Sequence, residues 1–133
     1  MSLKRFGVSL EKDYLEELDN MVEKKQFPNR SQAIRFLIKQ CMVKDQWSED
    51  KDVAGAIVMI YDHHKKELLN KSTAIQHNFH KVILSSQHVH LDHNNCIETI
   101  IVKGKSSVLQ TLADRLLALK GVTHGELVMT GGI

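Results

Sequence analysis

The feature that most constrains the fold is a single alternating segment near the start of the chain. Residues 5–10 read Arg-Phe-Gly-Val-Ser-Leu, so apolar side chains occupy one face of an extended segment. The other face carries Arg5, Gly7 and Ser9. This period of two predicts a half-buried β-strand. A single strand cannot form a sheet, and only helical patterns follow it until after residue 41, so the strand needs a partner from outside this segment.

Two amphipathic helices are expected after this strand. The first covers residues 11–25, with an apolar stripe that includes Leu15 and Leu18. Pro28 interrupts it, and Asn29 is a suitable N-cap for a second helix, with Gln32 completing a pair that resembles a capping box. A piece of this size buries too little apolar surface to be stable alone. We therefore expect an obligate, intertwined homodimer with a two-stranded antiparallel ribbon and four interlocked helices.

A polar, charged stretch at residues 44–52 predicts a domain boundary, which gives an N-terminal domain at 1–47 and a C-terminal domain at 53–133. The second domain has the pattern strand, helix, strand, strand, helix, strand. The expected elements are strand 53–61, helix 65–77, strands 82–91 and 96–102, helix 106–120 and strand 127–129. This βαββαβ order is ferredoxin-like. The predicted fold class is α+β.

Composition excludes several classes of protein. The chain has 133 residues and a net charge of +2, which is too small to indicate a polyanionic partner by itself. It has neither an apolar stretch of membrane-spanning length nor a basic-then-apolar leader, so we expect no membrane association. Its two cysteines cannot form a disulfide framework, which favours a reducing cytoplasm. Histidine stands out, because seven of the eight histidines fall between His63 and His93.

The strongest candidate for chemistry lies at residues 87–96, which read Gln-His-Val-His-Leu-Asp-His-Asn-Asn-Cys. His88 and His90 are two residues apart, so on a strand both imidazoles project from one face. Pairing His90 with Cys96 leaves a five-residue loop rich in Asp and Asn, which suits a hairpin. Opposed residues share a face, so the Cys96 thiolate would lie beside both histidines. Two imidazoles and a thiolate predict a transition-metal site for zinc, copper or nickel.

A fourth donor is needed to complete this site, and His77 is the best candidate. His77 ends a helix that is separated from the hairpin by His80 and a strand, and a ligand from a neighbouring subunit would make metal occupancy report on assembly. Glu98 lies on the same face as Cys96 and is expected to orient a ligand. His93 sits at the loop tip and is expected to be solvated. His63 and His64 are expected to be surface residues, with a weak secondary metal site as the alternative.

These residues resemble one known family, the nickel-responsive transcriptional regulators called NikR proteins, over essentially the whole chain. The resemblance rests on the pattern His-Val-His-x5-Cys with Gln76 and His77 upstream, and on the order of a ribbon-helix-helix domain followed by an ACT-type βαββαβ domain. It implies a homotetramer, a dimer of dimers, with one square-planar Ni(II) per subunit. The implied ligands are His88, His90 and Cys96 of one subunit and His77 of another. It also implies nickel-dependent binding to a palindromic operator, typically repressing nickel-uptake genes.

The DNA-binding residues follow from the ribbon and from the resemblance. A ribbon laid in the major groove would present Arg5, Gly7 and Ser9 to base edges, with Arg5 suited to guanine. Gly7 departs from the family, whose members usually place a hydroxyl there, so the operator sequence is not carried over. The start of the second helix, at Asn29, Arg30 and Ser31, offers free N–H groups to a phosphate. Lys65 and Lys66 match a basic pair that contacts DNA in the family.

Other readings stay open at this point. The chain could be a transcription factor that senses copper or zinc, a metal store or chaperone, or an ACT-type sensor of an amino acid. A metal-dependent hydrolase would need an open coordination position and a base, for which Glu98 is the obvious candidate. A second departure from the family concerns Gln32 and Phe36. Relatives can carry carboxylates there that hold a cation between the domains, and this chain carries none.

Overall fold

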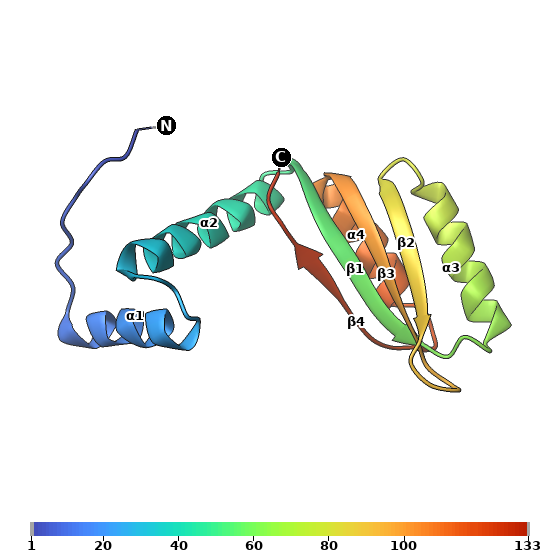
Figure 1. The fold of residues 1–133 in the computed structure, drawn as a ribbon. Helices are drawn as coiled ribbons and strands as arrows, with labels where there is room; N and C mark the ends of the chain where they lie inside the picture. The colour runs from blue at the N-terminus through green and yellow to red at the C-terminus, as the bar shows by residue number, and fades with distance from the viewer. Residues whose placement is uncertain (1, 133) are drawn as a thin grey trace. The chain divides into compact units, whose positions relative to one another are not determined.

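The computed structural model describes residues 2–132, which form two compact units that divide between Cys41 and Met42 (Figure 1). The N-terminal unit contains helix α1, Lys12–Lys24, and most of helix α2, Arg30–Ser48. The rest of α2 belongs to the C-terminal unit. No helix within residues 2–132 combines the length and apolar character that crossing a bilayer requires.

The start of α2 confirms the predicted N-cap. The backbone N–H of Gln32 donates to Oδ1 of Asn29 at 2.9 Å, which satisfies one of the free donors of the first turn. The second half of the predicted capping box does not form, because the Gln32 side chain instead accepts a hydrogen bond from Arg35 at 3.3 Å. Between the helices, Phe27 and Phe36 pack with ring centroids 5.3 Å apart.

Residues 2–10 form no strand in the single chain, in contrast to the prediction for residues 5–10. The physical reason is that a strand is defined by hydrogen bonds to a neighbouring strand, and no other segment within residues 2–132 pairs with residues 2–10. The apolar face that the alternation predicted is instead open to solvent. Phe6 is 75% exposed and Val8 is 55% exposed, which is unusual for side chains on a predicted buried face.

The C-terminal unit has the predicted βαββαβ order. Its elements are β1 Asp52–Tyr61, α3 Lys66–Asn78, β2 Ile83–His90, β3 Cys96–Lys105, α4 Ser106–Leu117 and β4 Val122–Met129. The four strands pair antiparallel in the order β2-β3-β1-β4, with β1 and β3 in the centre (Figure 1). Strand β4 starts five residues before the predicted 127, because its first residues pair with the end of β1 at Tyr61.

The core of this unit lies between the sheet and the two helices. Alternate residues of β1 and β3, such as Ile57 and Ile100, are fully buried against α4, which contributes Leu109, Leu112 and Leu116. The intervening strand residues face the other side of the sheet and are half-buried or exposed. One face of the sheet is therefore covered by helices and the other stays open.

The end of α2 is part of this core. Residues 44–48, predicted as a polar connector, are helical, and the Trp47 side chain is buried against Gly55 of β1. The Trp47 indole N–H donates to the carbonyl of Thr130 at 2.8 Å, and the Ser106 hydroxyl donates to the Trp47 carbonyl at 2.6 Å. Composition alone missed this role because one buried aromatic residue stands among charged neighbours.

Replacing Trp47 with Ala should lower the free energy of unfolding by about 3 to 5 kcal/mol, because a large buried side chain is lost. The control Trp47→Phe keeps an aromatic ring and should cost less, because it loses the indole hydrogen bond, worth about 0.5 to 1.5 kcal/mol, and only part of the buried side chain. Urea denaturation followed by circular dichroism measures both values, since Trp47 is the only tryptophan. Equal stabilities of Trp47→Ala and wild type would contradict a core role.

Candidate metal centre and nucleic-acid interface

The pairing of β2 with β3 sets the candidate metal ligands on one face of the sheet. His90 pairs with Cys96, as the sequence predicted, and His88 pairs with Glu98. The connecting loop is closed by Asp92, whose carboxylate accepts hydrogen bonds from the backbone N–H groups of Asn94 and Asn95 at 2.9 and 2.8 Å. The Asp/Asn-rich loop thus fixes the hairpin register by local hydrogen bonds.

Each candidate ligand has a different environment. Cys96 is buried, whereas His88 and His90 are exposed. His88 Nδ1 lies 3.2 Å from the Tyr61 hydroxyl and its Nε2 lies 3.5 Å from Glu98 Oε2. The His90 ring stacks on His63, with centroids 4.1 Å apart. The three side chains share a face, and in this structure His88 and His90 each contact another side chain.

The chemistry of this donor set fits a borderline transition metal. A thiolate and two imidazoles are ligands that select zinc, copper or nickel over magnesium or calcium. The site residues lie on paired strands, which hold donors more accurately than loops do. His88, His90 and Cys96 are therefore the residues of this face that would hold such an ion.

A buried carboxylate lies behind His88. Glu98 is only 1% exposed, and a carboxylate so far from water is costly unless it is hydrogen-bonded. The Tyr61 hydroxyl donates to Glu98 Oε1 at 2.7 Å, and the Gln76 amide donates to Glu98 Oε2 at 3.0 Å. Gln76 also donates to the Ser72 hydroxyl at 3.1 Å. These bonds join the sheet to α3 through one carboxylate.

Tyr61 is a residue of this site that the sequence interpretation missed. It ends β1, where it pairs directly with Cys96 and shares the helix-covered face. Burial, together with the carboxylate of Glu98, raises the pKa of Tyr61 far above its usual range, so the hydroxyl stays protonated and remains a donor. The alternation of β1 could have indicated its burial, because Ile57, Met59 and Tyr61 fall on one face of the strand.

His77, the proposed fourth ligand, is exposed on α3 next to Gln76. It lines a pocket of about 350 Å³ between α3 and the sheet, together with His80, His88 and Glu98. The structure thus places His77 and His88 on the walls of one pocket.

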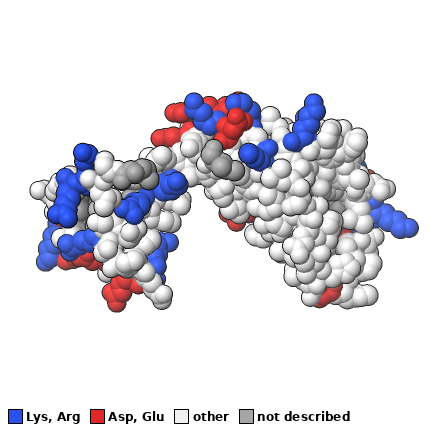
Figure 2. All heavy atoms as spheres, turned by 45° about the horizontal axis from the view of Figure 1, so that its top comes forward, with Lys and Arg blue, Asp and Glu red and all other residues white. Residues whose placement is uncertain are grey.

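The predicted DNA-reading residues of the N-terminal unit are all exposed. Arg5, Gly7 and Ser9 lie in the outstretched first segment. Arg5 lines a hollow of about 410 Å³ with Lys4, Ser31 and Arg35, so the first segment and the start of α2 meet there. Lys and Arg side chains gather over this unit in Figure 2. The stretch of residues 24–39 carries five basic side chains and no acidic one.

The start of α2 combines capping with an ion pair. Asn29 acts as the N-cap, and Arg30 donates two hydrogen bonds to the carboxylate of Asp19, at 2.8 and 3.0 Å. This bidentate contact holds the pKa of Asp19 below its usual value. Arg30 is therefore held against α1 in this structure, while Ser31 stays exposed.

Lys65 and Lys66 stand at the start of α3, and both are exposed. They line a hollow of about 270 Å³ with Lys71 and Lys120, and Lys71 is paired with Glu67 at 2.9 Å. Lys120 is far away in sequence but comes close because Gly121, in the turn after α4, packs against Lys65. The sequence pattern did not indicate this contribution from Lys120.

Known proteins define the class of this one. Residues 4–41 match the family described as ribbon-helix-helix protein, copG family, and residues 54–130 match the family described as NikR C terminal nickel binding domain. A relative from Syntrophus aciditrophicus is 51% identical over 96% of this chain and 93% of its own length. Another, from Thermococcus kodakarensis, is 46% identical over 98% of this chain and 96% of its own length. Both bear names as nickel-responsive regulators.

These matches span both units and define a class of transcription regulators rather than enzymes. The chain belongs to the NikR family of nickel-responsive regulators, with a ribbon-helix-helix DNA-binding domain and a nickel-binding domain. The family and the fold class expected from the sequence are confirmed. A solved structure of an uncharacterized protein from Thermotoga maritima matches with a TM-score of 0.54 at 16% identity, over 59% of this chain and 98% of that one. At this identity the match concerns the fold alone.

Tyr61→Phe should weaken nickel binding by about 10- to 100-fold, because Glu98 loses a hydrogen bond and no longer holds His88 in place. Calorimetric titration with nickel measures the change. Tyr14→Phe is the matched control, since it alters the only other tyrosine, which is exposed in the N-terminal unit. Identical affinities for Tyr61→Phe and wild type would remove Tyr61 from the site.

Proposed function

We propose that this regulator represses nickel-uptake genes by binding a palindromic operator when Ni(II) is bound. The observation that carries the proposal is the register of β2 on β3, which sets His88, His90 and Cys96 on one face. In the proposed site these three side chains and His77 of a neighbouring subunit hold one Ni(II) per subunit. A bound ion would supply a cross-link between side chains of two subunits.

Residues next to the proposed ligands hold two of them, His88 and His77, in position. Glu98 orients His88 and is itself fixed by Tyr61 and Gln76. Because Gln76 precedes His77 on α3, the hydrogen bond from Gln76 to Glu98 also restrains the turn of helix that carries His77. Glu98 therefore supports His88, a ligand of the proposed site in its own subunit, and also His77, a ligand of the proposed site in a neighbouring subunit.

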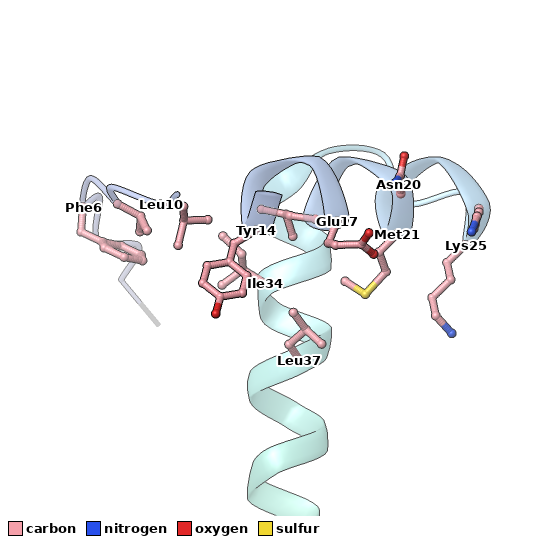
Figure 3. Close-up of a pocket in the computed structure, with 12 residues that line it drawn as sticks. Phe6, Leu10, Tyr14, Glu17, Asn20, Met21, Lys25, Ile34 and Leu37 are labelled. Atoms are coloured by element: carbon pink, nitrogen blue, oxygen red, sulfur yellow. The ribbon is translucent and has the colours of Figure 1, made fainter. Parts of the chain in front are cut away.

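An apolar groove supports the intertwined dimer of the N-terminal unit. The groove has a volume of about 630 Å³, and Figure 3 shows Phe6, Leu10, Tyr14 and Leu37 along it. Its apolar lining is a surface that proteins normally bury. We propose that the first segment of a second copy covers it while the two segments pair as a ribbon.

The open face of the sheet supports assembly beyond the dimer. Val89, Ile101 and Val128 lie on this face and are each exposed by more than a third. Ile101 and Val128 are both paired with Ala56, so they form a continuous apolar row across the sheet. We propose that this face joins two dimers into a homotetramer, so that the two DNA-binding dimers flank a core of ACT-type domains.

Operator binding would use the two kinds of contact that sequence-specific proteins combine. In this proposal Arg5 and Ser9 contact base edges, and the backbone at Ser31 together with Lys65 and Lys66 binds phosphates. Gly7 brings no side chain to the bases, so base recognition in each half-site depends on Arg5 and Ser9. Both cysteines are free thiols, which suits a protein that works in the reducing cytoplasm.

Nickel should raise the operator affinity of the wild-type protein by about 5- to 150-fold, the usual range for coupling between two sites. Cys96→Ala should abolish this increase because it removes the thiolate. Cys41→Ala is the matched control, since Cys41 is the other free cysteine and lies outside the site. Fluorescence anisotropy of labelled operator DNA, with and without nickel, measures the effect. A nickel response that survives Cys96→Ala would overturn the proposed site.

Arg5→Ala should weaken operator binding by about 1 to 3 kcal/mol and relax the preference at one base pair of each half-site. Lys66→Ala should weaken binding to every sequence alike and reduce the salt slope of the binding constant by about one. Binding measured on single-base operator variants over a range of salt separates the two effects. An equal loss on operator and unrelated DNA for Arg5→Ala would assign Arg5 to phosphate contact.

A further inference from the structure

The segment after β4 runs back to the end of α2 and is hydrogen-bonded to it (Figure 1). We name this segment, residues 130–132, the clasp. The Trp47 indole N–H donates to the carbonyl of Thr130 at 2.8 Å, and the backbone N–H of Gly132 donates to Oε1 of Gln46 at 3.0 Å. Both contacts lie within the C-terminal unit. Neither takes part in the proposed metal or DNA contacts.

Two glycines allow the clasp to approach α2 and β1 closely. A Cβ atom at Gly131 would lie 3.3 Å from Cγ2 of Val43, and a Cβ atom at Gly132 would lie 2.6 Å from the carbonyl oxygen of Asp52. A side chain at position 132 would therefore force the backbone away from α2. The clasp depends on glycine at this position because the backbone itself makes the contact.

The clasp is also bound to the central strand of the sheet. The backbone N–H and the hydroxyl of Thr130 both donate to the carbonyl of Ala54 on β1, at 3.0 and 2.6 Å. Thr130 thus continues the pairing of β4 with β1 beyond the end of β4. The end of α2 is joined to β1 through this short segment.

The turn between α2 and β1 is hydrogen-bonded as well. The backbone N–H of Lys51 donates to the carbonyl of Gln46 at 3.0 Å. Asp50 Oδ1 accepts the backbone N–H of Ser107, at the start of α4, at 3.0 Å. The carbonyl of Lys51 accepts the backbone N–H of Ser106 at 3.0 Å. The last turns of α2 are therefore bound to β1, to α4 and to the clasp.

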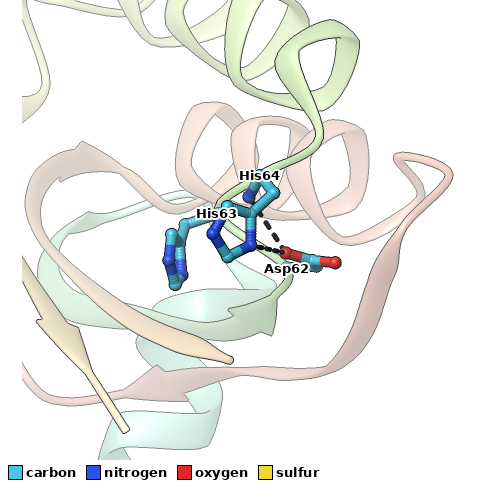
Figure 4. Close-up of side chains that lie close together, drawn as sticks. All are labelled: Asp62, His63 and His64. Atoms are coloured by element: carbon cyan, nitrogen blue, oxygen red, sulfur yellow. Dashed lines mark hydrogen bonds and ion pairs between the residues drawn. The ribbon is translucent and has the colours of Figure 1, made fainter. Parts of the chain in front are cut away.

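Strand β1 connects the clasp to the proposed nickel site. It begins at Asp52, beside the clasp, and ends at Tyr61, which pairs with Cys96. Ten residues of strand span about 30 Å. The turn after β1 is fixed too, because Asp62 Oδ1 accepts the backbone N–H of His64 at 2.9 Å (Figure 4). A strand paired on both sides passes on a displacement rather than absorbing it.

We propose that the clasp couples the nickel site to DNA binding, with Gln46 as its positioning residue on α2. This inference rests on the proposed nickel-dependent binding of operator DNA. Helix α2 carries a proposed phosphate contact at Ser31, near its start, and the clasp holds its other end. A change in the sheet on nickel binding reaches α2 through the clasp. Without the clasp, the last turns of α2 follow the sheet less closely and part of the nickel response is lost.

The variant Gln46→Leu tests the clasp in the full-length protein, because it removes the acceptor and keeps a good helix former of similar size. It should reduce the nickel-induced gain in operator affinity by about 2- to 12-fold, the range that one hydrogen bond supports. Nickel affinity and nickel-free operator affinity should stay unchanged. Gln46→Glu keeps an acceptor for the Gly132 N–H and should keep the full gain. Gln40→Leu, the same change at an exposed position of α2, is the matched control.

A second variant breaks the same hydrogen bond from the other side. Gly132→Pro removes the N–H that Gln46 accepts and should also reduce the gain. The double variant should lose no more than Gly132→Pro alone, because both changes remove one interaction. Fluorescence anisotropy of labelled operator DNA, with and without nickel, measures each gain. Calorimetric titration measures nickel affinity, and circular dichroism checks that each variant is folded.

A full nickel-induced gain in Gln46→Leu would overturn the coupling role of the clasp and leave the proposed function intact. An equal loss of affinity with and without nickel would also overturn it, since Gln46 would then only stabilise α2. Losses that add fully in the double variant would show that the two residues do not act through one bond. A wild type without any nickel-induced gain would refute the proposed function together with the clasp.

Discussion

The proposed nickel site depends on the antiparallel register between β2 and β3. Side chains alternate across a strand, so a shift of one residue would move His88 and His90 to the opposite face from Cys96. Three separate interactions hold this register: the ladder from Ser85 to His90, the turn closed by Asp92, and the packing of Ile100 in the core. The ladder consists of backbone hydrogen bonds, the turn is held by hydrogen bonds within the loop, and the core packing is driven by the hydrophobic effect. Their agreement fixes the position of the donors more strongly than any one of them alone.

Glu98 turns this register into a connection between the sheet and α3. Burying the Glu98 carboxylate, which is 1% exposed, would be very costly if it had no hydrogen-bond partners. Its partners come from three elements, β1, α3 and β2. The cost of burying the charge is therefore what ties these elements together. A hydrophobic residue at this position would pack as well but would leave α3 without a polar contact to the sheet. The carboxylate gives α3 a defined orientation, and α3 carries His77.

Sequence periodicity predicted most of this arrangement because the relevant interactions are local. The pair His90 and Cys96 follows from strand alternation and a turn of Asp and Asn, which are both read over a few residues. Trp47 was missed because its burial depends on Gly55 and Thr130, which are distant in sequence. The early start of β4 was missed for the same reason, since it depends on pairing with β1. Residues 5–10 show the other limit, because their alternation describes a strand whose partner a single chain does not contain.

The two units are each incomplete in a way that assembly would correct. The N-terminal unit leaves Phe6 and Val8 exposed, and the C-terminal unit carries on one face three of the four ligands of the proposed site. In the proposed tetramer the first deficit is met by a second ribbon strand and the second by His77 of a neighbour. An ion bound between subunits then acts on the assembly rather than on one chain. The ion can raise the DNA affinity only as far as its own affinity for the DNA-binding arrangement of the tetramer exceeds its affinity for the other arrangements. The rigid connection from His88 through Glu98 and Gln76 to the His77 helix is what would make that difference large, because a flexible helix would accept the ion equally well in every arrangement.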